Sequence, residues 1–232
     1  METITKAWYF AQSGQRKQRS VELMKEHRQQ FGTSGNCFDL AIWFMHELSQ
    51  EGITSYAVGH DLKTPDAHVA VVTLNEEGHR YFCDLGDQWI QPILIEKNRD
   101  SYCEDALEGF VTGGRIKVDA GSHEVQFSYL RPNGKVSRQK FDLEPIPYDQ
   151  LLDAANHSQS LLRHPLVEMR LFQPGEVLHW EFDRWRSFIS SNQGLVDESK
   201  LINNQEWAER IHTRTGMAQD LVYRSLDIYS QL

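Results

Sequence analysis

The stretch that decides the fold is "GTSGNCFDLAIWF", residues 32–44. Its first part consists of small, turn-forming residues, and an apolar helical pattern begins at Cys37. A free cysteine often packs as an ordinary buried residue. The N-terminus of a helix, however, is also where the helix dipole favours a thiolate, the nucleophilic form of cysteine. The placement of other chemically active residues has to decide between these two interpretations.

Composition and charge limit the classes of function. The chain has 232 residues and a formal net charge of −9, which disfavours a nucleic-acid partner. Its densest basic run, "QRKQR" at residues 15–19, is interpreted as the solvated start of a helix. No apolar run approaches the roughly 20 residues that span a bilayer, and residues 1–20 lack a signal-peptide pattern. The three cysteines form no C-x-x-C pair, which indicates a reducing compartment. We therefore expect a cytoplasmic protein with no membrane partner.

The hydrophobic pattern changes twice along the chain. Helical spacing predicts a helix over residues 19–31 and a second from Cys37 to about Gly52. Strands rich in β-branched residues follow, and two of them form a hairpin across "NEEG", residues 75–78. Alternating apolar and polar residues after Pro92 predict antiparallel strands, and two helices close the chain.

This order predicts an α+β fold. We expect three parts. They are a helix-plus-sheet domain at residues 1–92, which carries the candidate triad described below, an antiparallel β-barrel-like domain at 93–185 and a helical segment at 186–232.

A cysteine nucleophile needs a base and a third group that holds the base. His68 opens a strongly apolar strand, 31 residues after Cys37 (68 − 37), and Asp84 follows 16 residues later (84 − 68) on the neighbouring hairpin strand. A two-residue turn at residues 76–77 pairs His68 with Leu85. Asp84 is then one residue from the position opposite His68, and a bulge or a different turn would place the two side chains on the same face. Cys83 is then a packing residue on the other face.

Asp84 lies among apolar neighbours, where burying a carboxylate costs free energy unless a cation or a hydrogen-bond donor binds it. A histidinium at His68, paired with a Cys37 thiolate, would supply that partner. The sequence therefore predicts a catalytic triad of Cys37, His68 and Asp84. The alternative is that Cys37 is a core residue and that backbone donors satisfy Asp84. No cysteine or histidine pair has metal-ligand spacing, so we expect no metal site.

The segments "GNCFDLAIWFMHEL", "HVAVV" and "RYFCDLGD" together resemble the arylamine N-acetyltransferases. In that family a glycine-rich turn precedes the nucleophile in C-F-E-x-N, and H-x-x-L-x-V and D-V-G follow. The resemblance extends over about residues 32–185. It implies a cysteine-proteinase-like front domain of helices and sheet, an antiparallel β-barrel in the middle and a C-terminal lid.

The resemblance also implies an activity. An acetyl group would pass from acetyl-CoA to a thioester on the cysteine, and then to a small amine of the arylamine or hydrazine type. By position, Cys37 would be the nucleophile, His68 its base and Asp84 the group that orients the imidazole. At the substrate site we expect three further residues: Phe38, Asp87 and Trp89.

The sequence departs from the family pattern at three places, one of which is a helical segment before the cysteine that is shorter than in the family. Residues 33–36, "TSGN", lack the arginine and one glycine of R-G-G-x, and Asp87 replaces an aromatic residue after the D-x-G motif. A carboxylate there would favour a cationic amine. The transglutaminase-like enzymes share the Cys-His-Asp order and the G-x-C-x-x-x-A helix start, so an amidase or cysteine peptidase is the alternative activity. A non-catalytic binding protein, with an unreactive Cys37, is the third possibility.

Overall fold

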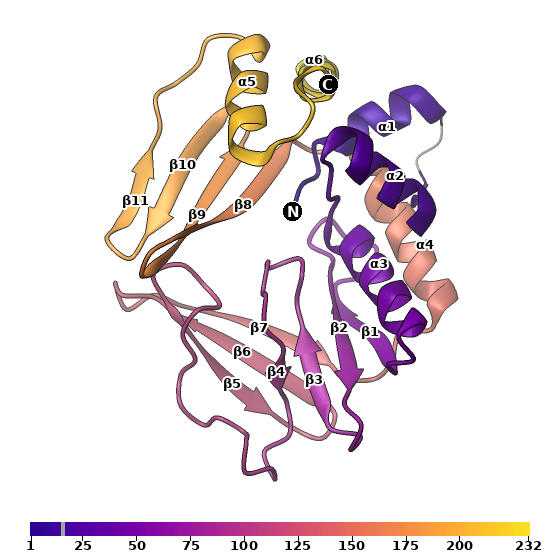
Figure 1. The fold of residues 1–232 in the computed structure, drawn as a ribbon, viewed down its shortest axis with the longest axis vertical. Coiled ribbons are helices and arrows are strands. Elements are labelled where there is room, and N and C mark those ends of the chain that lie inside the picture. Colours follow the sequence, from indigo (N-terminus) through magenta and orange to yellow (C-terminus); the bar gives the residue numbers. More distant parts are fainter. Residues whose placement is uncertain (15–16) are drawn as a thin grey trace.

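A computed structural model describes residues 1–14 and 17–232 of the chain. This part combines helices with antiparallel sheets (Figure 1). The helices are α1 (Thr5–Ser13), α2 (Val21–Phe31), α3 (Cys37–Gln50), α4 (Tyr148–Ser160), α5 (Asn204–Thr215) and α6 (Gln219–Tyr229). The strands are β1 (Ser55–His60), β2 (His68–Leu74), β3 (Arg80–Cys83), β4 (Ile93–Leu94), β5 (Arg115–Ala120), β6 (Glu124–Leu130), β7 (Val136–Asp142), β8 (Leu166–Gln173), β9 (Glu176–Asp183), β10 (Arg186–Ser191) and β11 (Gly194–Asp197).

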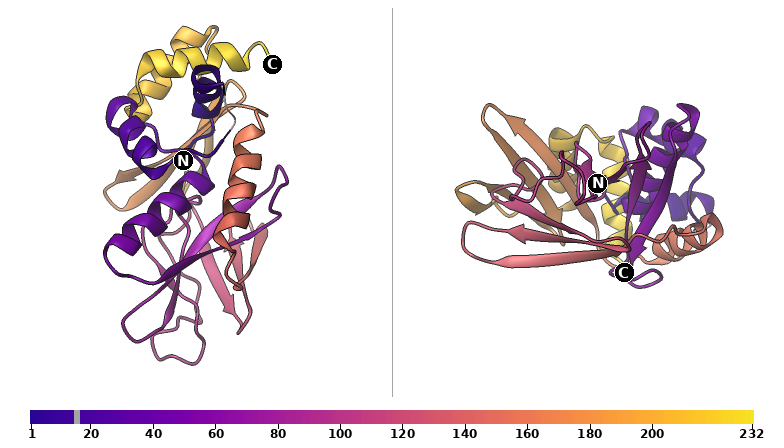
Figure 2. Two further views of the ribbon diagram at one scale, coloured as in Figure 1. Left: turned by 90° about the vertical axis from the view of Figure 1, so that its right-hand side faces the viewer. Right: turned by 90° about the horizontal axis from the view of Figure 1, so that it is seen from below.

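The strands form three separate antiparallel sheets in the described part of the chain. Their orders are β1-β2-β3-β4, β5-β6-β7 and β11-β10-β9-β8. Helix α3 packs on β1 and β2, with α2 and α4 beside it (Figures 1 and 2). Helix α5 packs on β8, and α6 packs against α5 and α1. Within the described residues, no helix is both long enough and apolar enough to span a membrane.

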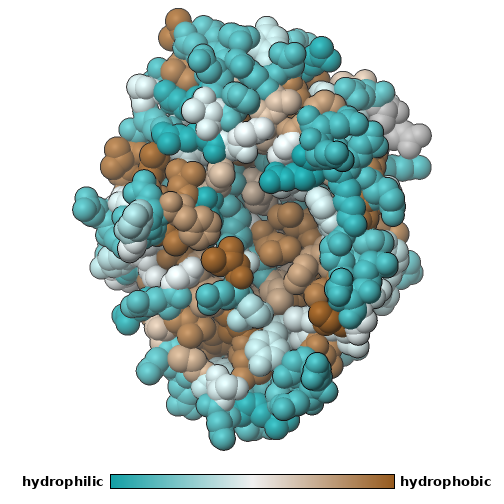
Figure 3. All heavy atoms as spheres, in the orientation of Figure 1, coloured by the Kyte–Doolittle hydropathy of each residue, from teal (hydrophilic) through white to brown (hydrophobic). Residues whose placement is uncertain are grey.

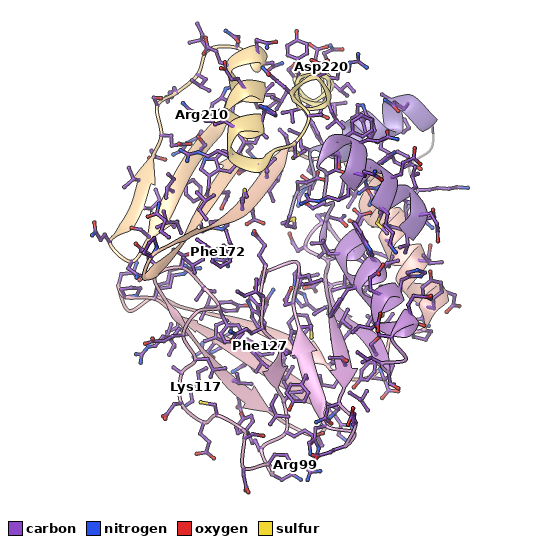
Figure 4. All side chains as sticks on the ribbon, in the orientation of Figure 1. Arg99, Lys117, Phe127, Phe172, Arg210 and Asp220 are labelled. Atoms are coloured by element: carbon purple, nitrogen blue, oxygen red, sulfur yellow. The ribbon has the colours of Figure 1, made fainter. Side chains whose placement is uncertain are left out.

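Strand β2 of the first sheet is buried on both faces over residues 69–72. On one face Phe38 and Ile42 of α3 pack against Val69 and Val71 of β2. On the other face the β5–β7 sheet contributes Phe127, which the side-chain view places between the two sheets (Figure 4). Burial of both faces explains why β2 reads as a continuous apolar run after its first residue.

The middle strands form no closed barrel in the described part of the chain, in contrast to the expectation. β5–β7 make an open three-stranded sheet, and β9 pairs with β10 rather than closing the ring. The predicted helical segment at residues 186–232 is also wrong at its start, because β10 and β11 precede the helices. A tight turn at Arg184 and Trp185, with φ of 48° and 57°, directs the chain into β10. The domain boundaries themselves stay predictions.

The basic run at residues 15–19 also differs from its interpretation. Residues 15 and 16 lie outside the described part. Arg19 is not solvated but buried, and its Nη2 lies 3.3 Å from Asp39 Oδ1. The sequence pattern gave no sign of this ion pair because its partner is 20 residues away (39 − 19).

Asp39 organises the start of α3. Its carboxylate accepts a hydrogen bond from the backbone N–H of Asn36, and the Asn36 side chain accepts one from the backbone N–H of Asp39, which together make a capping box. Gly35 has φ of 93°, and a Cβ there would lie 2.4 Å from Asp39 Oδ2. The turn before the helix therefore requires glycine at this position, because of both its backbone conformation and the space available.

We predict that Asp39→Ala destabilises the fold strongly. The substitution leaves the buried guanidinium of Arg19 without its ion pair and removes the capping box, and breaking a buried pair costs about 3–5 kcal/mol. Urea unfolding followed by circular dichroism measures the loss. Glu47→Ala is the matched control, because its pair with Lys25 is half exposed and screened by solvent, so its loss should leave the unfolding midpoint almost unchanged. A loss below about 1 kcal/mol for Asp39→Ala would contradict this account.

Candidate active site

Cys37 is the first residue of α3 and is partly accessible. The N–H groups of a first helical turn have no intrahelical acceptors and carry partial positive charge. This position stabilises negative charge on the thiol sulfur. The backbone N–H of Cys37 is for the same reason a candidate donor to an oxyanion.

His68 and Asp84 lie beside this thiol. His68 Nε2 is 2.8 Å from Asp84 Oδ2, and the Asp84 side chain is fully buried. The Cys37 side chain lies next to the same imidazole, because Cys37 Cβ and His68 Cε1 are both within 3 Å of the position that a Cβ at residue 86 would take. The structure thus brings together the three residues that the sequence analysis selected, in the order thiol, imidazole, carboxylate.

The hairpin register differs by one residue from the predicted one. Val71 pairs with Cys83 and Leu74 with Arg80, and the connection extends from Asn75 to His79 rather than being a two-residue turn. The Asn75 side chain accepts hydrogen bonds from two backbone N–H groups of this longer turn. Because strand side chains alternate in direction, the shift places Asp84 on the same face as His68. Cys83 lies on the opposite face, among the core side chains near α3, as expected.

The electrostatic environment favours a charged imidazole. Burial lowers the pKa of His68, but the Asp84 carboxylate and the contact with Cys37 outweigh burial, so the pKa lies well above its usual value. The protonated ring can therefore donate a proton and stabilise negative charge on a neighbouring group.

Gly86 is a site residue that the sequence analysis quoted but did not select. A Cβ at this position would lie 2.7 Å from His68 Cε1, 2.8 Å from Cys37 Cβ and 3.2 Å from Asp84 Oδ1. Real side chains do not approach so closely, so only glycine fits against all three residues. The signal in the sequence was a glycine two residues after the buried aspartate.

Asp87 has internal contacts, in contrast to the expected role at the substrate. Its carboxylate accepts a hydrogen bond from the Tyr129 hydroxyl at 2.6 Å, and its backbone N–H donates to Asp84 Oδ1 at 2.8 Å. Burial and the nearby Asp84 charge raise the pKa of Asp87. These contacts place it as a support for the loop that follows Asp84. Arg170 of β8 binds the same loop through the Asp87 carbonyl oxygen.

The other two expected substrate residues, Phe38 and Trp89, differ in what their side chains contact. Phe38 is fully buried in the core, because it lies about 100° around the helix from Cys37 and points toward the sheet. It is therefore a packing residue and not a substrate contact. Trp89 is also 97% buried (3% exposed), but it forms part of the wall of an apolar groove of about 920 Å³ beside α3.

We predict that Cys37 reacts quickly with iodoacetamide at mildly acidic pH. An ordinary thiol with a pKa of about 8.5 loses about 20-fold in rate between pH 8 and pH 6.5. Below its raised pKa His68 keeps its proton and stabilises negative charge beside it, so the rate at Cys37 should fall clearly less than that of an ordinary thiol. Alkylation is measured by mass spectrometry in a Cys103→Ser background, because Cys103 is exposed. Burial and Asp84 raise the pKa of Cys83 to about 12, so Cys83 should not interfere.

Asp84→Asn is the matching variant. It removes the carboxylate that raises the pKa of His68, so the rate should fall with pH as for an ordinary thiol. An identical pH profile in this variant and its parent would argue against the ion pair.

We predict that Gly86→Ala slows alkylation of Cys37 at pH 6.5 by at least about tenfold, because the added methyl group must displace a member of the triad. The control is Gly78→Ala in the same hairpin. Gly78 has φ of 79° and no atom within 4 Å of the added Cβ, so that variant is strained but leaves the site intact. Equal rates for Gly86→Ala and its parent would show that the site tolerates the extra atom.

No family model matches the sequence, and no curated protein matches it. Solved structures do match. The arylamine N-acetyltransferase from Mycobacterium abscessus superposes with a TM-score of 0.72 at 13% identity, over 97% of this chain and 82% of that one. The Mycobacterium marinum enzyme in complex with CoA gives 0.69 at 10% identity, over 97% and 86%.

A third neighbour is the arylamine N-acetyltransferase NAT3 from Bacillus cereus, described as having a Cys-His-Glu triad. It gives a TM-score of 0.64 at 12% identity, over 94% of this chain and 85% of that one. These likenesses extend over nearly the whole chain and agree with the resemblance seen in the sequence. The chain has the fold of the arylamine N-acetyltransferases.

Proposed function

We propose that the protein is an acyltransferase that moves an acetyl group from acetyl-CoA to a small amine through a thioester on Cys37. One observation carries the proposal. The thiol at the start of α3 lies beside an imidazole whose Nε2 binds a fully buried carboxylate. The CoA complex of the M. marinum neighbour supports a coenzyme A thioester as the donor.

In the first half-reaction the Cys37 thiolate attacks the acetyl carbonyl carbon of the donor. The carbonyl oxygen becomes an oxyanion next to the N-terminus of α3, where the positive end of the helix dipole stabilises it. The bond from the carbonyl carbon to the coenzyme A sulfur then breaks. His68 donates its proton to the departing thiolate, which leaves as free coenzyme A.

In the second half-reaction an amine attacks the Cys37 thioester. The neutral imidazole of His68 accepts a proton from the amine nitrogen as the new C–N bond forms. The bond from carbon to Cys37 Sγ breaks, the amide leaves and the thiolate–imidazolium pair is restored. Asp84 fixes the ring orientation in both steps and stabilises the charged ring.

We predict a covalent acetyl adduct on the Cys103→Ser protein after brief incubation with acetyl-CoA. Intact-protein mass spectrometry should show the addition of one acetyl group, and a Cys37→Ala variant should show none. Addition of a small amine such as hydrazine should then remove the adduct and yield the acetylated amine. If no adduct forms while iodoacetamide still labels Cys37 rapidly, the nucleophile is active but the donor is different, as in an amidase.

A further inference from the structure

The groove beside α3 begins close to the candidate nucleophile. Helix α3 covers β1 and β2 but leaves the same face of β3 open, and the loop after β3 forms the opposite wall. Figure 3 shows apolar side chains gathered in the middle of the drawn face, near the region where Figure 1 draws β3 and β4. The residues that line the groove are Phe44, Leu48, Gly52, Ile53, Thr54, Thr73, Leu74, Asn75, Glu76, Tyr81, Cys83, Leu85, Trp89, Ile90, Gln91 and Pro92.

One stripe of α3 connects the thiol to this groove. Cys37, Ala41, Phe44 and Leu48 are spaced by four, three and four residues, which places them on one side of the helix. At about 1.5 Å of rise per residue, the 11 residues from Cys37 to Leu48 span about 16 Å, close to the length of an extended chain of about a dozen carbons.

A narrow cavity lies between the thiol and the groove. Cys37, Ala41 and Gly86 contribute to its wall, and two residues, Cys83 and Leu85, line both the cavity and the groove. The cavity is too narrow to hold a water molecule. Leu85 is only partly buried, so rotation of its side chain would join the two spaces.

The lining suits a hydrocarbon chain. Glu76, which is exposed and lies in the hairpin turn, is the only charged residue that lines the groove in the described part of the chain. A groove without cations does not suit the phosphates of coenzyme A, whereas its apolar walls stabilise a buried alkyl chain. Ile53 and Ile90, 40% and 69% exposed, extend this apolar surface outward.

We propose that Cys37 accepts medium- and long-chain acyl groups, with the hydrocarbon chain lying along α3 in this groove. The inference rests on the proposed function and specifies its donor as a fatty acyl thioester of coenzyme A. The chemistry is that of the acetyl reaction. Cys37 Sγ bonds to the acyl carbonyl carbon, the bond to the coenzyme A sulfur breaks, and the proton held by His68 leaves with coenzyme A.

The test compares acetyl-, octanoyl- and dodecanoyl-CoA as donors to the Cys103→Ser protein, each below its micelle concentration. Intact-protein mass spectrometry follows the Cys37 adduct against time. Each buried methylene adds about a factor of four to binding, so octanoyl-CoA should reach half-maximal rate at a concentration at least about tenfold below acetyl-CoA, even with partial burial.

Two variants test where the acyl chain of the donor binds. Cys83→Leu narrows the groove next to the thiol and should lower the rate with octanoyl- and dodecanoyl-CoA, relative to acetyl-CoA, by at least about tenfold. Leu48→Trp fills the far end and should lower only the dodecanoyl rate relative to the acetyl rate. The matched control for the first variant carries Cys103→Leu in place of Cys103→Ser. It also removes the exposed thiol and makes an equal enlargement outside the groove, so the rate ratios between donors should stay unchanged.

The outcomes separate the two proposals. An acetyl adduct with no gain from longer chains leaves the acyltransferase intact and overturns the groove assignment. A gain that persists in both groove variants also overturns it, because the chain would then lie elsewhere. The absence of an adduct from every donor overturns the proposed function and the inference together. Should Cys83→Leu fail to fold, Leu48→Trp alone decides between these outcomes.

Discussion

The bond between His68 and the buried Asp84 is the interaction on which the rest of the site depends. A fully buried carboxylate is costly unless donors and a positive charge surround it. Asp84 accepts from the imidazole and from the backbone N–H of Asp87, and its own carbonyl accepts from the N–H of Trp89. The carboxylate therefore sets the charge of the imidazole and the shape of the loop after β3.

That loop is where the three sheets meet. Arg170, on β8, donates to the Asp87 and Phe110 carbonyl oxygens and to the Thr112 hydroxyl, while Tyr129 on β6 donates to the Asp87 carboxylate. Contacts from two other sheets thus hold a loop of the first sheet. The consequence is a triad whose geometry depends on the whole chain, including strands far from Cys37 in the sequence.

The first turn and the sides of helix α3 have different contacts. Its capping box and the buried Arg19–Asp39 pair hold its first turn, where Cys37 lies. One side packs Phe38 into the core, and an adjacent side faces the apolar groove. Helix α3 thus carries a thiol at its N-terminus and an apolar stripe along the following turns. It combines a nucleophile with a surface for an uncharged acyl chain.

The sequence by itself determined the local features. The small, turn-forming residues before Cys37 predicted the start of α3, and the β-branched run predicted β2. The isolation of His68 and Asp84 in apolar strands identified them as unusual. Each of these signals acts over a few residues. Only the tertiary structure decided the rest. The Asn75 side chain shifted the register by one residue, packing moved Phe38 into the core, and Tyr129 bound the carboxylate of Asp87. Contacts between residues distant in sequence, such as Arg19 with Asp39 or Arg170 with the loop at Asp87, depend on how the elements pack, and no local pattern records them.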